Sequence, residues 1–226
     1  MNSTEIKDHF RLEVSDTELP QLWSDEELFV WLNDAYSMFV RFTGGIPDFT
    51  SEACEVAVSE GESRVDLHPS ILRIMQASRR SDGREIDILN ATDTSRMSPS
   101  DYGRLKPLLM DPSVGEVKVL VIGMQRNVGR VIHVPLADDT LDLVIYRLPL
   151  TPITGEGQEL VGVEPMHHFH LIKWMKALAY RKQDAETFDP TAASDNEDLF
   201  RLYCAEVKSE NERYKHKTRT VAYGGI

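Results

Sequence analysis

The sequence reads Glu164-Pro-Met-His-His-Phe-His-Leu-Ile-Lys-Trp-Met-Lys-Ala-Leu-Ala-Tyr-Arg-Lys-Gln-Asp184 near the C-terminal end of the chain, and this stretch predicts one amphipathic helix. Its apolar residues recur at intervals of three and four and so share one helical face: Leu171, Trp174, Met175 and Leu178. Pro165 suits a first helical position, where its missing N–H costs no hydrogen bond. We expect this helix to lie at the centre of a helical layer.

Two further helices are predicted, one near each end of the chain. The first of these helices is expected to begin just after Ser24. Ser24 can cap it, Glu27 completes a capping box, and Trp23 can pack onto Leu28. Its expected buried stripe is Leu28, Trp31, Leu32, Ala35, Phe39 and Phe42. The last helix begins at Asp189-Pro190, and its expected stripe is Leu199, Phe200, Tyr203 and Val207.

The block between these helices changes from helical periodicity to the alternation of β-strands at about residue 53. Residues 54–58 and 63–67 predict a hairpin, and Asp82-Gly83 predicts a tight turn between two further strands. The other expected strands are 71–77, 84–89, 116–122, 130–135 and 140–148. We therefore expect six or seven antiparallel strands, which suffice for a small sheet sandwich.

The expected fold class is α+β, with a helical bundle formed by both chain ends and an inserted antiparallel β-sheet or sandwich domain. Its expected parts are an N-terminal arm with the first bundle helix (1–50), the inserted β domain (51–150), the C-terminal bundle helices (151–211) and a basic C-terminal docking tail (212–226). The bundle scaffold is expected to comprise Trp31, Leu32, Phe39, Leu171, Trp174, Leu178, Phe200 and Tyr203.

Charge is distributed unevenly along the 226 residues, whose net charge is −12. Residues 1–60 carry 13 acidic side chains against Lys7, Arg11 and Arg41, whereas residues 213–219 carry four basic side chains and no acidic one. The net charge argues against general nucleic-acid binding. The basic segment itself is compatible with a protein partner, a free tail or nucleic acid. No apolar run reaches membrane-spanning length, and we expect no signal peptide.

Candidate chemical sites are few. His167 and His170 stand three residues apart after Glu164, a spacing that allows metal ligation on one helical face, but no HExxH pattern is present. The adjacent carboxylates Glu26-Glu27 and Asp138-Asp139 point in different directions and do not resemble an acid/base couple. Since phosphate-binding glycine motifs and nucleophile signatures are also missing, we expect no catalytic residues, no cofactor and no metal.

Several motifs occur in a characteristic order along the chain. They are Trp23-Ser-Asp-Glu-Glu-Leu28, Val65-Asp-Leu-His-Pro-Ser-Ile-Leu-Arg-Ile74, Val144-Ile-Tyr-Arg-Leu-Pro-Leu150, Glu164-Pro-Met-His-His168 and Gln183-Asp-Ala-Glu-Thr-Phe-Asp-Pro190. This ordered set resembles the head–tail adaptor (connector) proteins of tailed bacteriophages, especially short-tailed ones, over about residues 22–215. No single motif is as specific as a catalytic signature.

The resemblance implies a structural virion protein of the neck, assembled in the host cytoplasm, without a membrane. Such adaptors form a ring, usually of twelve copies, beneath the portal protein; they extend the DNA ejection channel and present a platform for tail nozzle and tail fibre proteins. DNA would pass through without specific binding. The resemblance places portal docking at Arg213, Lys215, Lys217, Arg219 and Tyr223.

The resemblance also assigns a structural role to some residues and leaves the role of others undetermined. Its scaffold positions are Asn33, Asp34, His168, Trp174, Tyr180 and Asp184. The role of residues 1–20 stays open. The alternative functions are a virion-associated cell-wall hydrolase and a metal-binding module through His167 and His170.

Overall fold

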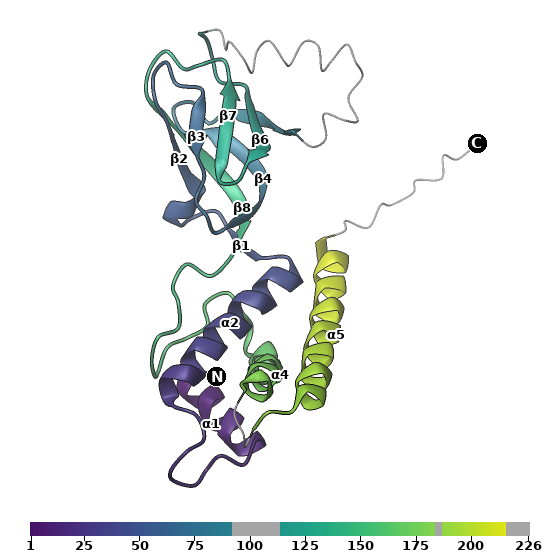
Figure 1. The fold of residues 1–226 in the computed structure, drawn as a ribbon. Helices are drawn as coiled ribbons and strands as arrows, with labels where there is room; N and C mark the ends of the chain where they lie inside the picture. The colour runs from purple at the N-terminus through teal and green to yellow at the C-terminus, as the bar shows by residue number, and fades with distance from the viewer. Residues whose placement is uncertain (92–113, 184–186, 216–226) are drawn as a thin grey trace, which may run out of the picture. The chain divides into compact units, whose positions relative to one another are not determined.

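The computed structural model describes residues 1–91, 114–183 and 187–215. The chain divides into two compact units, one of residues 1–45 and 149–226 and the other of residues 46–148. The first unit is helical and the second holds a β-sheet, so the expected α+β class is confirmed (Figure 1).

The helical unit contains α1 Ser3–Glu13, α2 Asp25–Thr43, α4 Pro165–Arg181 and α5 Pro190–Lys215. Helix α4 packs against α5, α2 and α1 (Figure 1). It is buried on more than the one predicted face, because Ile172 and Ala177 are as inaccessible as Leu171 and Met175. Burial of this extent makes α4 the central helix of its unit.

Helix α2 begins where the capping box predicts. The Ser24 hydroxyl accepts the Glu27 backbone N–H at 3.3 Å, and the Ser24 N–H donates to the Glu27 carboxylate at 3.2 Å. Trp23 and Leu28, the expected staple pair, are both buried. Gly44 ends the helix with φ of +102°, a left-handed conformation that glycine adopts without strain.

Helix α1 lies in the segment that sequence analysis treated only as a polar arm. Asn2 caps it, since the Asn2 side chain accepts the Glu5 N–H at 3.0 Å and the Glu5 carboxylate accepts the Asn2 N–H. Ile6 and Phe10 are fully buried one turn apart. A two-residue apolar stripe between charged residues was too short to be recognised as a helix.

The stripe expected for α5 is partly wrong. Phe200 and Val207 are buried, as expected, but Leu199 is 53% exposed. Cys204 is buried in its place, four residues after Phe200, because residues four apart share a helical face. In the described residues, no helix is long and apolar enough to cross a bilayer.

The second unit contains, within the described residues, one curled eight-stranded sheet. Its strands are β1 Ile46–Asp48, β2 Glu55–Val58, β3 Arg64–Asp66, β4 Ile71–Arg79, β5 Glu85–Asn90, β6 Val119–Gln125, β7 Val128–Ile132 and β8 Asp139–Arg147. The path runs β1-β8-β4-β5-β6-β7-β3, and β2 also pairs with β8. Its core is apolar, and Leu120, Leu141 and Ile145 are fully buried in it.

The strand pairing differs from the expectation in two places. Strands β2 and β3 do not form the predicted hairpin, because β2 pairs with β8 and β3 pairs with β7. Strands β5 and β6 are parallel, with Ile88 opposite Leu120, so the sheet is not purely antiparallel. The predicted turn at Asp82-Gly83 is confirmed between the antiparallel strands β4 and β5, where Gly83 has φ of +67°.

Candidate functional site

The expected scaffold residues lie in the core of the helical unit or at its margin. Leu32, Phe39, Leu171 and Phe200 are almost fully buried, whereas Trp31, Leu178 and Tyr203 are half-buried. The centroid of the Trp174 ring lies 5.1 Å from that of the Phe200 ring, and the two rings are tilted by 46° where α4 meets α5. Aromatic pairs at this distance stabilise beyond their apolar area, so they fix α5 against α4.

Polar contacts of the other expected scaffold positions are also within this unit. The Asn33 side-chain oxygen accepts the Ile153 N–H at 3.0 Å. The Tyr180 carbonyl accepts the Asp189 N–H at 3.0 Å and so joins the end of α4 to the start of α5. Asp184 lies outside the described residues.

The three histidines at the start of α4 have separate structural contacts. His167 Nδ1 lies 2.8 Å from the Tyr203 hydroxyl, and the His170 ring stacks on the Tyr203 ring at 3.4 Å. His168 is buried, and its Nε2 lies 3.0 Å from the Val163 carbonyl oxygen. Across the parts of the chain that the structure describes, no three His, Cys, Asp or Glu side chains gather as metal ligands would.

Burial lowers the pKa of His167 and of His170 below the ordinary value. The two histidines face the same tyrosine on α5, so a positive charge on His167 also disfavours one on His170. This packing therefore favours the neutral form of both imidazole rings over the protonated form.

The adjacent carboxylates also have structural contacts. Glu27 accepts from Lys182 Nζ at 2.6 Å, and this bond together with the cap at Ser24 lowers the pKa of Glu27. Asp138 accepts the Glu60 N–H at 2.8 Å, and Asp139 accepts the Ser81 hydroxyl at 2.7 Å. These bonds stabilise the start of helix α2 and the connections between strands.

The expected docking tail is described only at its beginning. Arg213 is exposed on the last turn of α5, Tyr214 is 94% exposed, and Lys215 is the last residue of the helix. Lys217, Arg219 and Tyr223 lie outside the described residues. The described part therefore presents one exposed basic and one exposed aromatic side chain on the last turn of α5.

Sequence reasoning missed an ion-pair network that fixes α1. The buried Arg11 guanidinium pairs with buried Asp16 and with Asp25 at 2.6 Å, and it also donates to the Trp23 carbonyl at 3.0 Å. Lys7 pairs with Asp25 at 2.8 Å. Lys7 and Arg11 stand four residues apart, a spacing that places both side chains on one helical face. This signal was overlooked because the surrounding segment is rich in acidic residues.

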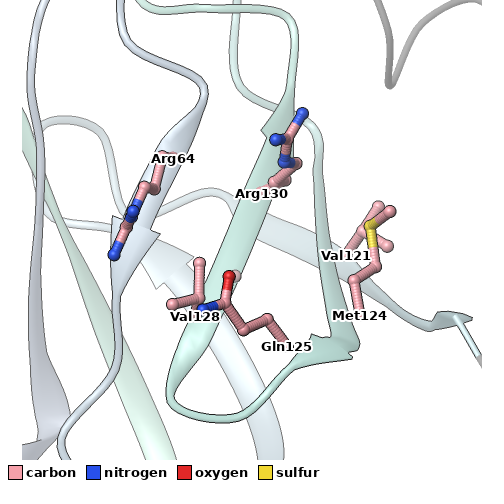
Figure 2. A pocket seen from close by; sticks show the side chains of 7 residues that line it. Arg64, Val121, Met124, Gln125, Val128 and Arg130 are labelled. Atoms are coloured by element: carbon pink, nitrogen blue, oxygen red, sulfur yellow. The ribbon is translucent and has the colours of Figure 1, made fainter.

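A surface concavity lies over strands β3, β6 and β7 of the β unit (Figure 2). Its volume is about 240 Å³. The lining combines two guanidinium groups, one amide and several apolar groups: Arg64, Val121, Met124, Gln125, Val128, Gly129 and Arg130. Sequence analysis did not single out this place, because the residues come from three separate strands.

Comparison with known families decides the kind of protein. The model of a family described as SU10 adaptor protein matches residues 1–221, nearly the whole chain. The chain belongs to the SU10 adaptor protein family. Membership indicates a phage adaptor, a structural and non-enzymatic component of the virion that contacts other head and tail proteins. No curated protein matches the chain.

In this member of the SU10 adaptor family, the polar contacts described above join parts of one unit to each other. Buried polar side chains of the helical unit join helices to one another, as Arg11 joins α1 to the start of α2. Among the described residues, the exposed end of α5 and the concavity on the β-sheet are two features that could contact other molecules.

Proposed function

We propose that this protein is a head–tail adaptor that joins the capsid portal to the tail of a short-tailed phage. Copies of the chain, twelve by analogy with related adaptors, form a ring below the portal, extend the DNA ejection channel and carry the tail nozzle and fibres. The observation that carries the proposal is the match of the adaptor family to residues 1–221.

Within this proposal the helical unit is the ring-forming bundle, and both chain ends contribute to it. The packing of α4 against α1, α2 and α5 supports this role, because a central helix contacted on several sides gives a rigid block. The proposed parts are those expected from the sequence: 1–50, the inserted β domain 51–150, 151–211 and the docking tail 212–226.

The docking tail is proposed to bind the portal through Arg213, Lys215, Lys217, Arg219 and Tyr223. Support comes from the four basic side chains of residues 213–219 in a chain of net charge −12. Arginine and tyrosine are frequent anchors in protein interfaces. A ring of many weak tails binds more tightly than one tail, since the later contacts are intramolecular.

The same net charge suits a channel through which DNA passes without specific binding. Acidic surfaces repel the phosphate backbone, and therefore they do not retain the genome during ejection. The proposed location is the virion neck, with assembly in the host cytoplasm.

Truncation tests this function. Deleting residues 212–226 is expected to abolish co-sedimentation with portal rings while leaving the fold intact, because the described side chains of this segment, those of residues 212–214, are exposed. The matched control is Lys208→Gln, which removes an exposed charge of α5 outside the tail and is expected to leave docking unchanged. Normal docking by the folded truncated protein would refute the tail assignment.

A further inference from the structure

Helix α5 carries a second apolar stripe, on the side away from its buried one. Leu199 is 53% exposed and Leu202 is 60% exposed. The two leucines stand three residues apart, and exposed Asp195 precedes Leu199 by four, so the three side chains share one helical face. Asp198 is exposed beside them. These four residues are called the outer stripe of α5 below, and they combine two leucines with two carboxylates.

The two carboxylates of the outer stripe form no ion pair with any described residue. Glu197, on the inner side of the same helix, differs from them in this respect, because it pairs with Arg181 and with Arg201. Asp195 and Asp198 therefore keep their negative charge uncompensated next to exposed apolar groups. Such a surface matches a partner that is apolar and carries a cation.

The β unit has a surface of this kind on the solvent side of strands β4 and β8. Two register shifts in β4 leave Leu72 and Met75 as the extra residues of β-bulges, and these side chains are 38% and 46% exposed. Arg73 is exposed and lies opposite the residue of β8 that is two positions from Val144. Residues two apart in a strand share a face, so Arg73 and the 38% exposed Val144 lie on one face. Leu72, Arg73, Met75 and Val144 are called the outer face of the sheet below.

Arg73 differs from the other arginines of these two strands. Arg79 of β4 pairs with Glu116 at 3.0 Å, and Arg147 of β8 pairs with Asp48. Over the described parts of the chain, Arg73 has neither an ion pair nor a hydrogen bond from its side chain. Its guanidinium is therefore an uncompensated cation among exposed apolar groups, the counterpart of the carboxylates on α5.

The two surfaces also agree in length. From Asp195 to Leu202 the helix rises about 10 Å, and from Leu72 to Met75 the strand advances about 10 Å. A helix packed on the face of a sheet is one of the standard layer arrangements of proteins. Each surface thus supplies the charge, the apolar groups and the length that the other requires.

We propose that the outer stripe of α5 in one copy of the chain packs on the outer face of the sheet in a neighbouring copy. Asp195 and Asp198 pair with Arg73, and Leu202 then lies towards Met75. The contact is heterologous, because each copy uses one surface for each of two neighbours, and heterologous contacts can close into a ring. That copies stand side by side rests on the proposed function.

Disulfide trapping between two chains of different size tests this contact. One chain carries Leu202→Cys, and the other carries Met75→Cys and a larger tag; the native Cys54 and Cys204 are buried. Mild oxidation of the mixture is expected to give a dimer of the two chains, since the contact brings the new thiols within bonding distance. The control Met124→Cys, at a 54% exposed position of β6 outside the outer face, is expected to give little of this dimer.

Charge exchange makes the test specific. Arg73→Glu is expected to slow trapping about tenfold, because like charges then face each other. Combining it with Asp195→Arg/Asp198→Arg in the other chain is expected to restore the rate. The matched control Arg126→Glu makes the same charge change at an exposed position outside the outer face and is expected to leave the rate unchanged. All of these positions are exposed, so the variants are expected to fold.

Three results would overturn the proposal: no dimer of the two chains, as much dimer with Met124→Cys, or no recovery on charge exchange. A chain that carries both new cysteines is expected to form a ladder of linked copies, and a cross-link within single chains would also overturn it. Trapping needs no portal, and co-sedimentation of the same variants measures docking separately. Loss of this contact with normal docking would therefore refute the contact and leave the adaptor function standing.

Discussion

Trp174 of α4 donates its indole N–H to a carboxylate oxygen of Asp34 on α2, at 2.6 Å, and so joins residues 140 positions apart in the sequence. Trp174 is only 6% exposed, whereas Asp34 lies at the surface. A charged acceptor makes a short and strong hydrogen bond to a neutral donor. The bond fixes the angle at which α4 meets α2, because an indole donor has a single direction.

Asp34→Ala is expected to lower the free energy of unfolding by about 1–2 kcal/mol, since the nearly buried indole N–H loses its acceptor. Asp34→Asn keeps an acceptor oxygen and is expected to lose less than half of that amount. Urea unfolding followed by tryptophan fluorescence measures both variants. Equal losses for alanine and asparagine would show that the bond does not contribute to stability.

Asp16→Asn is expected to destabilise the helical unit by about 3 kcal/mol, the lower end of the cost of breaking a buried ion pair, because Arg11 keeps Asp25. Arg181→Gln provides the comparison. Its ion pair with Glu197 is half exposed, so the expected loss is below about 1 kcal/mol. Thermal unfolding of the two variants side by side distinguishes them, and similar losses would contradict a structural role for the Arg11 network.

Acidification is expected to weaken the helical unit through His167 and His170. Burial lowers the pKa of both rings below the unfolded value of about 6.5, so the unfolded chain binds protons more readily than the folded one. Their contribution to stability is therefore complete above about pH 6.5 and is lost as the pH falls through and below that value. The carboxylates that oppose this shift are Glu164 and Glu210 near His167 and Glu206 near His170.

The free energy of unfolding, measured from pH 8 to pH 5, checks this expectation. The double variant His167→Gln/His170→Gln is expected to show a smaller loss across this interval than the unchanged chain. His9→Gln serves as a control on α1, where the ring lies 6.0 Å from Phe169. An unchanged pH dependence in the double variant would exclude these two histidines as its source.

Gly129→Ala is expected to destabilise the β unit by about 1–3 kcal/mol, the usual cost of overpacking. A Cβ there would lie 2.9 Å from Leu120 Cδ1 and 3.0 Å from Val65 Cγ2, both in the core. At Gly115 the nearest atom is His133 Cβ at 3.6 Å, an ordinary contact, so Gly115→Ala is expected to change stability by no more than about 0.5 kcal/mol. Differential scanning calorimetry compares the two, and an unaffected Gly129 variant would contradict the close packing of β7.

The features that sequence analysis predicted correctly depend on neighbouring residues. The start of α2 follows from Ser24 and Glu27, and the turn between β4 and β5 follows from Asp82-Gly83. Both signals act within four residues, and the structure confirms both. The start of the last helix at Pro190 is likewise confirmed.

The features that sequence analysis missed depend on residues that are far apart in the sequence. The alternation around Val56 and Val65 identified two strands but not their partners, which are β8 and β7 and lie about 60–90 positions further along the chain. Helix α1 was missed because Lys7 and Arg11, although charged, are buried by ion pairs with distant acids. The arginine pair of the concavity was missed because only the register brings Arg64 opposite Arg130.

Electron microscopy of the purified chain mixed with portal rings of its own phage tests the central claim most directly. We expect a ring of copies on one face of the portal, continuous with its channel, and no such ring with the chain lacking residues 212–226. A portal that stays bare in the presence of excess folded chain would contradict the adaptor function proposed here.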